Sequence, residues 1–472
     1  MSHERTVVQQ IADLAARVAA DGLDDALRHD VARRYLDLLG NSLAATELSP
    51  GLAVTAMVDE WGGRPQSTVI GSRTRLPAAS AALVNGTLAH SLDFDDTHLP
   101  SVLHPSSSVL PAALAVAEAR GADGASLLDA AGVGVEVTSR LGMAGYDQAA
   151  RSNVFFDRGQ HATSICGAIG ASVAAAMLHG LDADGIAHAA GIAASMGAGV
   201  IEANRTGGTV KRIHCGWAAH AGVVAADLAR FGITGPPTVI EGRFGFLQAW
   251  LGEHANVSAV TEGLGERWEL PGIFFKPYPC NHFTHAGVDA ALRMRAAGVR
   301  AEEVEEIELG VPTSVLRTIA EPAEAKARPE SGYHAAFSGP YTVASALLGG
   351  GGLGLSHDDF ADERARDPER LALAARVRCV PDARCDEIFP EQLPAVLRVR
   401  LRDGRQLEER VDVNRGGPQN PLTDDEIRTK YRINASRALD PARVEELAEA
   451  ALALPGSPDL GRLMAPLSAA VR

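Results

Sequence analysis

The chain has 472 residues, of which 46% are hydrophobic and 22% charged, and a formal net charge of −15. This length indicates two or three domains, and this composition excludes a mainly disordered chain. The negative charge excludes general nucleic-acid binding, because a protein that contacts the phosphate backbone needs a cationic face. An anionic substrate would therefore need a local basic pocket.

Neither a targeting signal nor a membrane span is recognisable in the sequence. The N-terminus is charged and amphipathic and lacks a signal-peptide core. The five cysteines lie far apart with no C-x-x-C spacing, which indicates reduced thiols without a disulfide framework or zinc site. The uncharged stretch 159–181 is rich in Ala, Gly and Ser and predicts a buried helix rather than a lipid-facing one. We expect a cytoplasmic protein with no membrane partner.

The first half of the chain carries helical patterns. Apolar residues at i, i+3 and i+4 predict two helices within residues 1–45, separated by Gly22. Residues 67–75 predict a short hairpin. From Pro77 to about Arg230, helical patterns follow one another without strand alternation. This half is therefore predicted to be mainly α.

The composition changes near residues 272–287, and the region beyond predicts α+β structure. A helix is expected over Ala286 to Ala297, followed by an alternating stretch, "EVEEIELGVP". Residues 395–413 predict a hairpin, with Asp403-Gly404 as a two-residue type I′ turn.

The last part of the chain returns to helix. Thr423 begins a helix, with Glu426 at capping-box spacing. We expect these helices to pack back on the N-terminal ones. The predicted fold is mainly α with α+β: a large discontinuous helical domain, with a smaller α+β domain that contains a short antiparallel sheet. The expected boundaries are 1–270 plus 415–472, and 271–414.

The stretch "LAHSLDFDDTHLPSVLHPSSS" crowds carboxylates and histidines together. A helix over 82–97 would place His90, Asp93 and Thr97 on one face. His104 would lie at the junction with a following helix that one of the serines caps. A carboxylate beside a histidine near a helix N-terminus suits acid–base catalysis. The alternative is that the carboxylates face solvent and His104 is a turn histidine.

Two other interpretations of "DFDDT" concern metal chemistry. The D-x-D nucleophile motif of haloacid-dehalogenase-type phosphatases should follow a buried strand, whereas the preceding "ALVNGTLAHSL" reads as helix. A magnesium site would normally pair with a second acidic motif, and none is recognisable.

Further candidate side chains lie between residues 158 and 222. His161 precedes the uncharged helix, where a neutral capping histidine is the alternative. Lys211 and His214 lie three apart at the start of an alanine-rich helix. Burying an unpaired ammonium group is costly, so Lys211 either faces solvent or binds an anion. Together with Arg205 and Arg212, it supplies the basic pocket that the net charge lacks.

Two later motifs add candidates. His282 and His285 lie in "KPYPCNHFTHAG", and Ser338 and Tyr341 begin a helix, although a tyrosine there usually serves packing. No Gly-rich nucleotide loop, H-E-x-x-H motif or nucleophile elbow is present. The sequence therefore predicts no cofactor and no metal. The remaining His, Asp, Lys, Tyr and Thr side chains form a set that can bind carboxylates and transfer protons.

Taken in order, these motifs resemble the MmgE/PrpD family. They are "HSLDFDDT…HPS", "GQHAT…GAIGA", "KRIHCGWAA", "KPYPC", "FSGPYTVA" and "GPQNPLT…KY". The family includes 2-methylcitrate dehydratase, cis-aconitate decarboxylase and iminodisuccinate epimerase. The resemblance implies a homodimer, a helical domain closed by the C-terminal segment, a smaller α+β domain, and cofactor-free chemistry on small polycarboxylates.

The resemblance also assigns residues and a reaction. The positions that look like the active site of cis-aconitate decarboxylase are Asp93, Thr97, His104, His161, Lys211 and Tyr341. We predict Asp93, His104, Lys211 and Tyr341 as catalytic residues, and Thr97, His161, His214 and His285 as substrate-binding residues. The expected activity is that of a lyase which dehydrates a di- or tricarboxylate through an enolate-like intermediate, as 2-methylcitrate dehydratase does. Decarboxylation or epimerisation is the alternative, and a phosphatase or a non-catalytic helical dimer module is more distant.

Overall fold

The computed structural model describes residues 5–148 and 151–468. Its contacts divide the chain into two compact units, with boundaries after Ile273 and after Lys430. Unit 1 comprises the residues before the first boundary and after the second, and unit 2 the residues between them. The sequence placed the second boundary earlier, at 415. Arg415 is held within unit 2, because its backbone N–H donates to Asp289 at 3.1 Å and its side chain pairs with Glu426.

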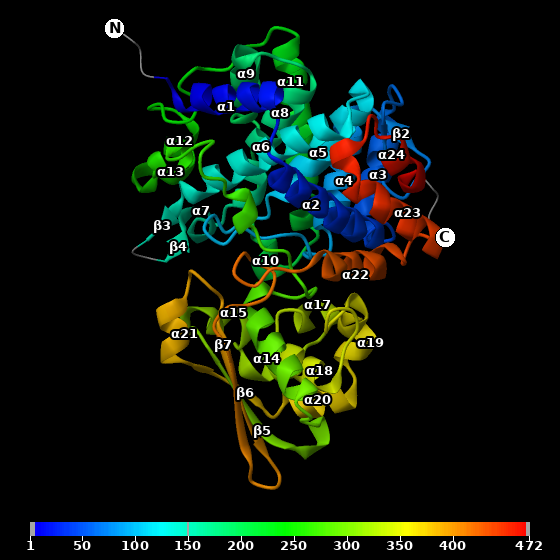
Figure 1. The fold of residues 1–472 in the computed structure, drawn as a ribbon. Coiled ribbons are helices and arrows are strands. Elements are labelled where there is room, and N and C mark those ends of the chain that lie inside the picture. The colour runs from blue at the N-terminus through cyan, green and yellow to red at the C-terminus, as the bar shows by residue number, and fades with distance from the viewer. Residues whose placement is uncertain (1–4, 149–150, 469–472) are drawn as a thin grey trace. The chain divides into compact units, whose positions relative to one another are not determined.

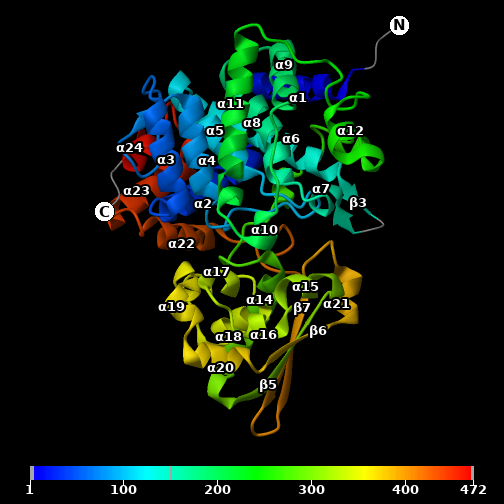
Figure 2. The same ribbon diagram turned by 180° about the vertical axis from the view of Figure 1, so that it is seen from behind.

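Unit 1 consists of helices and two very short hairpins (Figures 1 and 2). Its helices are α1 (Val7–Asp21), α2 (Asp25–Ala44), α3 (Ser49–Trp61), α4 (Ala78–His90), α5 (Ser106–Arg120), α6 (Gly124–Met143), α7 (Val154–Asp157), α8 (Ala162–Leu178), α9 (Ala183–Ala193), α10 (Ala203–Thr206), α11 (His214–Arg230), α12 (Phe246–Leu251), α13 (Ser258–Thr261), α23 (Pro441–Leu452) and α24 (Gly461–Leu467), with α22 (Asp424–Ala435) crossing the second boundary. Its strands are β1 (Ser67–Thr68), β2 (Arg75–Leu76), β3 (Tyr146–Asp147) and β4 (Ser152–Asn153).

The N-terminal elements follow the sequence prediction. α1 and α2 are separated at Gly22, whose φ of 79° favours glycine. Asp24 caps α2 by accepting the backbone N–H of Leu27 at 2.8 Å. The predicted first hairpin is confirmed, since Ser67 pairs with Leu76 in antiparallel register. The expectation of no strand before Arg230 is wrong at β3 and β4, which form a second small hairpin.

Glycines allow the central helices α4, α6, α8 and α11 to approach one another closely. A Cβ atom built on Gly86 of α4 would lie 2.8 Å from the Cα of Gly216 of α11. A Cβ on Gly170 of α8 would lie 2.3 Å from the carbonyl oxygen of Gly134 of α6. These contacts are backbone to backbone, so no larger residue fits without moving a helix.

The C-terminal helices of unit 1 pack beside its N-terminal ones, and α23 contacts α2 (Figure 1). Asn434 donates to the side chain of Asn41 at 2.9 Å, and both residues are buried. The backbone of Tyr431 lies against Gly40, where an added Cβ would be 3.2 Å away. Residues separated by nearly the full chain length thus share one core.

Unit 2 is an α+β unit. Its helices are α14 (His285–Ala296), α15 (Leu316–Ile319), α16 (Ala323–Ala327), α17 (Gly332–Ala335), α18 (Gly339–Leu348), α19 (Asp362–Ala365), α20 (Pro368–Ala374) and α21 (Ala383–Ile388), and its strands are β5 (Val304–Val311), β6 (Val377–Pro381), β7 (Ala395–Leu401) and β8 (Gln406–Val411). The strand order is β6-β5-β7-β8. The β5–β7 and β7–β8 pairs are antiparallel, as expected, whereas the β5–β6 pair is parallel, so the sheet is mixed. The helices between β5 and β6 provide the long crossover that a parallel pair requires.

The turn of the β7–β8 hairpin also differs from its prediction. The hairpin itself is present, and Arg400 pairs with Gln406. The N–H of Gly404 donates to the carbonyl of Leu401 at 2.9 Å, and Gly404 has a φ of 89°. Asp403 is not among the residues with positive φ, whereas a type I′ turn needs positive φ at both central positions. The connection is therefore a longer turn that closes on Gly404.

Three other expectations can be compared with the structure. The capping box is present: Thr423 N–H donates to Glu426 at 2.7 Å, and Glu426 N–H donates to Thr423 Oγ1 at 3.3 Å. All five cysteines are free. Within the described residues, no helix has the length and apolar character needed to cross a membrane. The predicted fold class, mainly α with α+β, is confirmed.

Candidate active site

The helix that leads to the acidic cluster ends earlier than the sequence predicts. α4 stops at His90, and Asp93 has a left-handed φ of 51°. Residues beyond it form a loop that is held by a bridge between His98 and Leu103. The expectation that His90, Asp93 and Thr97 share one helix face is therefore wrong. The preceding element is a helix, which is not the strand that a D-x-D phosphatase motif would follow.

Asp96 anchors this loop in the core of unit 1. Its carboxylate binds Arg34 of α2 at 2.9 Å, and the two side chains are 3% and 1% exposed. The hydroxyl of Ser106 also donates to this carboxylate, so Ser106 does not act as the helix cap that the sequence suggested. Burial raises the pKa of Asp96, while Arg34 and Ser106 oppose that shift. The loop thus depends on a contact between residues 62 positions apart.

The backbone of Asp96 fixes the tautomer of His104. The Nδ1 atom of His104 lies 2.6 Å from the Asp96 carbonyl oxygen. A carbonyl oxygen only accepts hydrogen bonds, so Nδ1 carries a proton and Nε2 is left for other chemistry. Thr97 Oγ1 lies 3.4 Å from Nδ1, and Thr163 Oγ1 accepts the backbone N–H of His104 at 3.1 Å. His104 is therefore held in one orientation from two sides.

Asp93 brings two predicted catalytic groups together. Its Oδ1 atom lies 3.7 Å from His104 Nε2 and 3.7 Å from Lys211 Nζ. The side chains of His104, Asp93 and Lys211 are 16%, 28% and 18% exposed, so solvent and ligands can reach them. Lys211 projects from a 3-10 turn, Val210–Ile213, which immediately precedes α11. A cation, a carboxylate and an imidazole therefore meet at one accessible place.

Two buried histidines lie at the beginnings of α8 and α11. His161 Nδ1 is 2.9 Å from His214 Nδ1, so one ring donates and the other accepts. Burial lowers the pKa of both rings, and the nearby charges of His90 and Lys211 add to this effect. The pKa of His214 falls to about 4. Both rings are neutral at neutral pH. His161 occupies the capping position of α8 but makes no side-chain cap.

Below these groups lies a buried cluster of His90, Asp95 and Cys215. His90 Nδ1 is 2.8 Å from Asp95, whose carboxylate also accepts the hydroxyl of Ser107 at 2.6 Å. Burial alone would lower the pKa of His90, but Cys215 and Asp95 together raise it to about 10. The imidazole rings of His90 and His104 have centroids 5.4 Å apart. A proton on His90 is thus stabilised by the carboxylate of Asp95, which balances its charge.

Two sets of side chains place possible metal ligands near one another: His90, Asp95 and Cys215, and Asp93, Asp95 and His104. In each set the ligand atoms lie within 4.8 Å of one another. The nitrogen, oxygen and sulfur donors of the first set suit zinc better than magnesium. Asp95 already accepts hydrogen bonds in this arrangement. That the site works without a metal stays a prediction. Turnover measured with and without EDTA tests it.

The neutral His161–His214 pair predicts a loss of stability in acid. The unfolded chain takes up protons on these residues below pH about 6.5, whereas the folded chain does not until near pH 4 for His214. The free energy of unfolding should therefore fall between pH 6.5 and 4, by roughly 2–3 kcal/mol for His214 alone. Urea titrations of His214→Asn, whose amide preserves a partner for His161, should show a smaller fall. If the free energy of unfolding of His214→Asn falls as much between pH 6.5 and 4 as that of the wild-type protein, the histidine pair is not neutral in the folded chain.

Two predicted site residues, Tyr341 and His285, belong to unit 2 and are buried there. The hydroxyl of Tyr341 donates to the carbonyl oxygen of Asp359 at 2.8 Å. His285 Nε2 lies 3.1 Å from the carbonyl oxygen of Cys280. Burial lowers the pKa of His285 to about 3, with Lys276 adding to the shift. Their assignment to catalysis and substrate binding stays a prediction.

Sequence reasoning gave no role to the residues that support the site, although it noted His90 within the acidic stretch. His90, Asp95 and Cys215 form the buried cluster, and Arg34 holds Asp96. The interpretation that Asp95 and its neighbour face solvent is wrong, because Asp95 is 2% exposed. The only sequence signal for these residues was the density of carboxylates in the stretch "DFDD". Their partners lie on other helices and had no local signature.

Comparison with known proteins identifies the family. The family model described as the MmgE/PrpD N-terminal domain matches residues 9–257, and that of the MmgE/PrpD C-terminal domain matches residues 278–454. Cis-aconitate decarboxylase of Mus musculus is 30% identical over 94% of this chain and 89% of its own length. The Homo sapiens protein of that name is 30% identical over 88% and 85%, and that of Aspergillus terreus is 28% identical over 86% and 84%. With both domains matched and its length shared with these relatives, the chain belongs to the MmgE/PrpD family.

Proposed function

We propose that this protein is a lyase that removes CO₂ from a small di- or tricarboxylate of the cis-aconitate type, without a metal or organic cofactor. The observation that carries the proposal is the meeting of His104 Nε2 and Lys211 Nζ at one oxygen of Asp93, each 3.7 Å away. The relatives named cis-aconitate decarboxylase support the choice of reaction. Their name extends to this chain only as part of the proposal.

Substrate binding rests on the cations of the site. Lys211 would pair with one substrate carboxylate, since an ammonium group is a compact point charge with three donors. The neutral His161–His214 pair would hydrogen-bond a second carboxylate. Thr97, 9% exposed beside His104, would position the substrate. A dianionic or trianionic substrate thereby finds its basic pocket in an acidic chain.

The chemical step needs one proton donor. The bond between carbon and the leaving carboxylate breaks, CO₂ departs, and the electron pair passes into the remaining carboxyl-conjugated system as an enolate-like carbanion. His104 Nε2, protonated and stabilised by Asp93, then transfers its proton to carbon. Lys211 stabilises the negative charge that develops on the remaining carboxylate. Nδ1 keeps its proton on the Asp96 carbonyl throughout.

Dehydration is the second candidate reaction, and the position of Lys211 favours it. Removal of water needs a base for the proton next to the carboxylate and an acid for the departing hydroxyl. His104 and Lys211 share Asp93 and so provide two proton-transfer groups at one place. The same enolate-like intermediate serves both reactions. The sequence prediction of a 2-methylcitrate dehydratase-like activity therefore stays a prediction.

The reaction is tested by supplying cis-aconitate, citrate, 2-methylcitrate and iminodisuccinate, each with and without EDTA. We expect CO₂ release from cis-aconitate that EDTA does not reduce. A new conjugated double bond from citrate or 2-methylcitrate would favour dehydration instead. Activity abolished by EDTA and restored by a divalent cation would contradict the metal-free proposal. No turnover of any of these acids would contradict the substrate class.

Lys211→Met should lower kcat/KM by about 10²-fold or more, through both a higher KM and a lower kcat, because the bound carboxylate loses its cationic partner and the developing negative charge loses its stabilising group. Lys211 is the only lysine of unit 1, as the chain has just four, at 211, 276, 326 and 430. Lys326→Met is the matched control, since that ammonium donates to the carbonyls of Thr318 and Phe337 within unit 2. Wild-type KM in Lys211→Met would contradict its role.

The family resemblance also proposes a homodimer, and unit 1 carries a suitable apolar patch. Trp61 and Trp217 are 52% and 44% exposed, and both lie beside His220, with ring centroids 6.1 and 5.5 Å from its ring. Met57, 40% exposed, lies one helical turn before Trp61. Exposed aromatic clusters of this kind typically mark an interface. Light scattering should give twice the 49.3 kDa chain mass, and Trp217→Glu should reduce it.

A further inference from the structure

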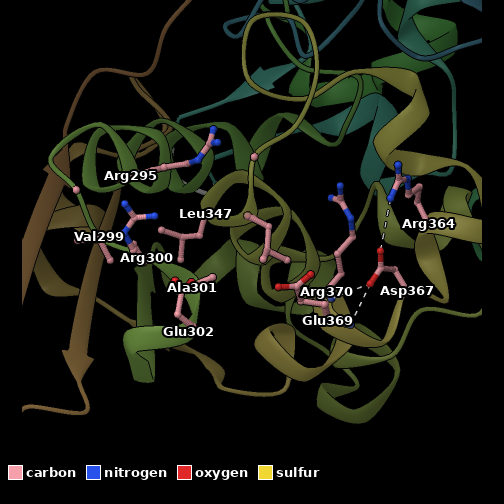
Figure 3. A pocket seen from close by; sticks show the side chains of 13 residues that line it. Arg295, Val299, Arg300, Ala301, Glu302, Leu347, Arg364, Asp367, Glu369 and Arg370 are labelled. Carbon is pink, nitrogen blue, oxygen red and sulfur yellow. Dashed lines mark hydrogen bonds and ion pairs between the residues drawn. The ribbon is translucent and has the colours of Figure 1, made fainter.

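Unit 2 contains a cavity of about 480 Å³ whose lining is rich in arginine (Figure 3). Four arginines and three carboxylates line it, together with apolar side chains. They are Arg295, Arg300, Arg364, Arg370, Glu302, Asp367, Glu369, Val299, Ala301, Leu347 and Leu348. A volume of this size is typical of small-molecule sites. The excess of cations stands out in a chain with a net charge of −15.

Arg370 is the most constrained of these arginines. It is 6% exposed, and its Nη2 atom donates to Asp359 Oδ1 at 3.0 Å. The other oxygen of Asp359 accepts the backbone N–H groups of Gly351 and Ser356 at 2.9 and 2.8 Å. The guanidinium group is therefore fixed before any ligand arrives. Its Nη1 atom is buried and has no hydrogen-bond partner. A buried donor without a partner is unfavourable, so a ligand that brings an acceptor to it would be stabilised.

Two of the other three arginines form no ion pair with a described residue. Arg295 and Arg300 are exposed and make no side-chain hydrogen bond or ion pair with any described residue. The guanidinium group of Arg295 lies over Gly349, where an added Cβ would be 2.6 Å from the guanidinium carbon. Arg364 reaches Asp367 at 3.6 Å. By contrast, Arg398 and Arg400 on strand β7 each bind carboxylates at 3.0 Å or less.

The carboxylates near this cavity pair with only two of its four arginines, Asp359 with Arg370 and Asp367 with Arg364. Asp367 caps α20 by accepting the backbone N–H of Glu369 at 2.9 Å, which occupies one of its oxygens. Glu302 and Glu369 are exposed. Figure 3 shows Leu347 next to Arg295, and Arg370 farther along the same lining. The lining thus combines guanidinium donors with an apolar floor.

We propose that this cavity binds a small organic phosphate. Guanidinium groups match phosphate oxygens with paired N–H donors, and Arg370 Nη1 would gain the acceptor it lacks. The apolar side chains suit the organic part of such a ligand. A bare phosphate ion would leave most of the cavity volume unfilled. The site is separate from the lyase site proposed in unit 1 and does not depend on that reaction.

The proposal is tested by isothermal titration of the full-length protein with ADP, pyrophosphate and citrate at low ionic strength. We expect ADP to bind with a Kd of about 1 mM or tighter, pyrophosphate more weakly, and both less tightly as salt rises. Arg295→Gln/Arg300→Gln should weaken ADP binding by about tenfold or more. Arg317→Gln should not, because this exposed arginine of unit 2 lies outside the cavity.

Arg370→Lys gives a second test, because lysine can keep the ion pair with Asp359 but removes the unpartnered Nη1 donor. It should weaken ADP binding while the unfolding temperature stays near that of wild type. Absence of ADP binding to the wild-type protein would overturn the proposal. The proposal would also be overturned if Arg295→Gln/Arg300→Gln bound ADP as tightly as the wild-type protein does. An equal loss of ADP affinity in Arg317→Gln would overturn it as well. Binding of citrate alone, lost in the double variant, would overturn phosphate as the ligand class.

Discussion

Replacement of His104 by asparagine is expected to lower kcat by about 10²–10⁴-fold, the usual contribution of one acid–base group. The asparagine amide reaches the position of Nδ1 and can still donate to the Asp96 carbonyl, which His104 does at 2.6 Å. It offers no group at the position of Nε2. The loop should therefore stay folded while proton transfer is lost. Steady-state kinetics on the best substrate of the acid screen measures the effect.

His254 provides a matched control for this variant. Its Nδ1 atom lies 3.7 Å from Asp147, the same separation as between His104 Nε2 and Asp93, but its side chain is 44% exposed. His254→Asn should leave kcat unchanged. Both variants should unfold at the same urea concentration as the wild-type protein. A folded His104→Asn variant with wild-type turnover would rule out His104 as the proton donor.

Arg34→Met should cost about 3–5 kcal/mol of the free energy of unfolding, the usual effect of removing one partner of a buried ion pair. Arg34 is 1% exposed and binds both Asp96 and Asp30, at 2.9 and 2.8 Å. Its loss leaves Asp96 as an unpaired buried carboxylate. Because the backbone of Asp96 holds His104, turnover should fall together with stability. Denaturant midpoints and kcat measured on the same preparation test both effects.

Two comparison variants separate the buried pair from ion pairs in general. Arg432→Met removes a partner of Glu445 at 2.6 Å, where both side chains are about half exposed, and should cost no more than about 1 kcal/mol. Adding Asp96→Asn to Arg34→Met should recover part of the lost stability, because the amide carries no charge to be compensated. If Arg34→Met unfolds at the wild-type midpoint, Asp96 does not depend on this contact.

Local sequence signals predicted the elements whose causes are local. Gly22 separates the first two helices, and Thr423 with Glu426 begins α22, because each depends on neighbouring residues. The loop after His90 was predicted as helix because its residues have no strong helix breaker before Pro100. Asp93 instead has a left-handed backbone, and the loop beyond it is held by the contact of Asp96 with Arg34, 62 positions away, which the sequence does not display.

The candidate site was predictable in part. The motifs marked Asp93, His104 and Lys211, and the structure brings these three together. The buried cluster was not predictable, because His90 and Cys215 meet only when α4 and α11 are in contact. In unit 2 a residue was identified from the sequence, but its contacts were not. Tyr341 was singled out at a helix start, but a helix start alone does not indicate what its hydroxyl contacts.

The contact between Gly86 and Gly216 bears on how function is transferred among distant relatives. A Cβ on Gly216 would lie 2.2 Å from the carbonyl oxygen of Leu83, so a bulkier residue there must push α4 and α11 apart. A homologue could then retain every polar side chain of the motifs and still hold them in another geometry. When a function is assigned to such a homologue, the residues at positions 86 and 216 should therefore be compared first, and the site histidines afterwards.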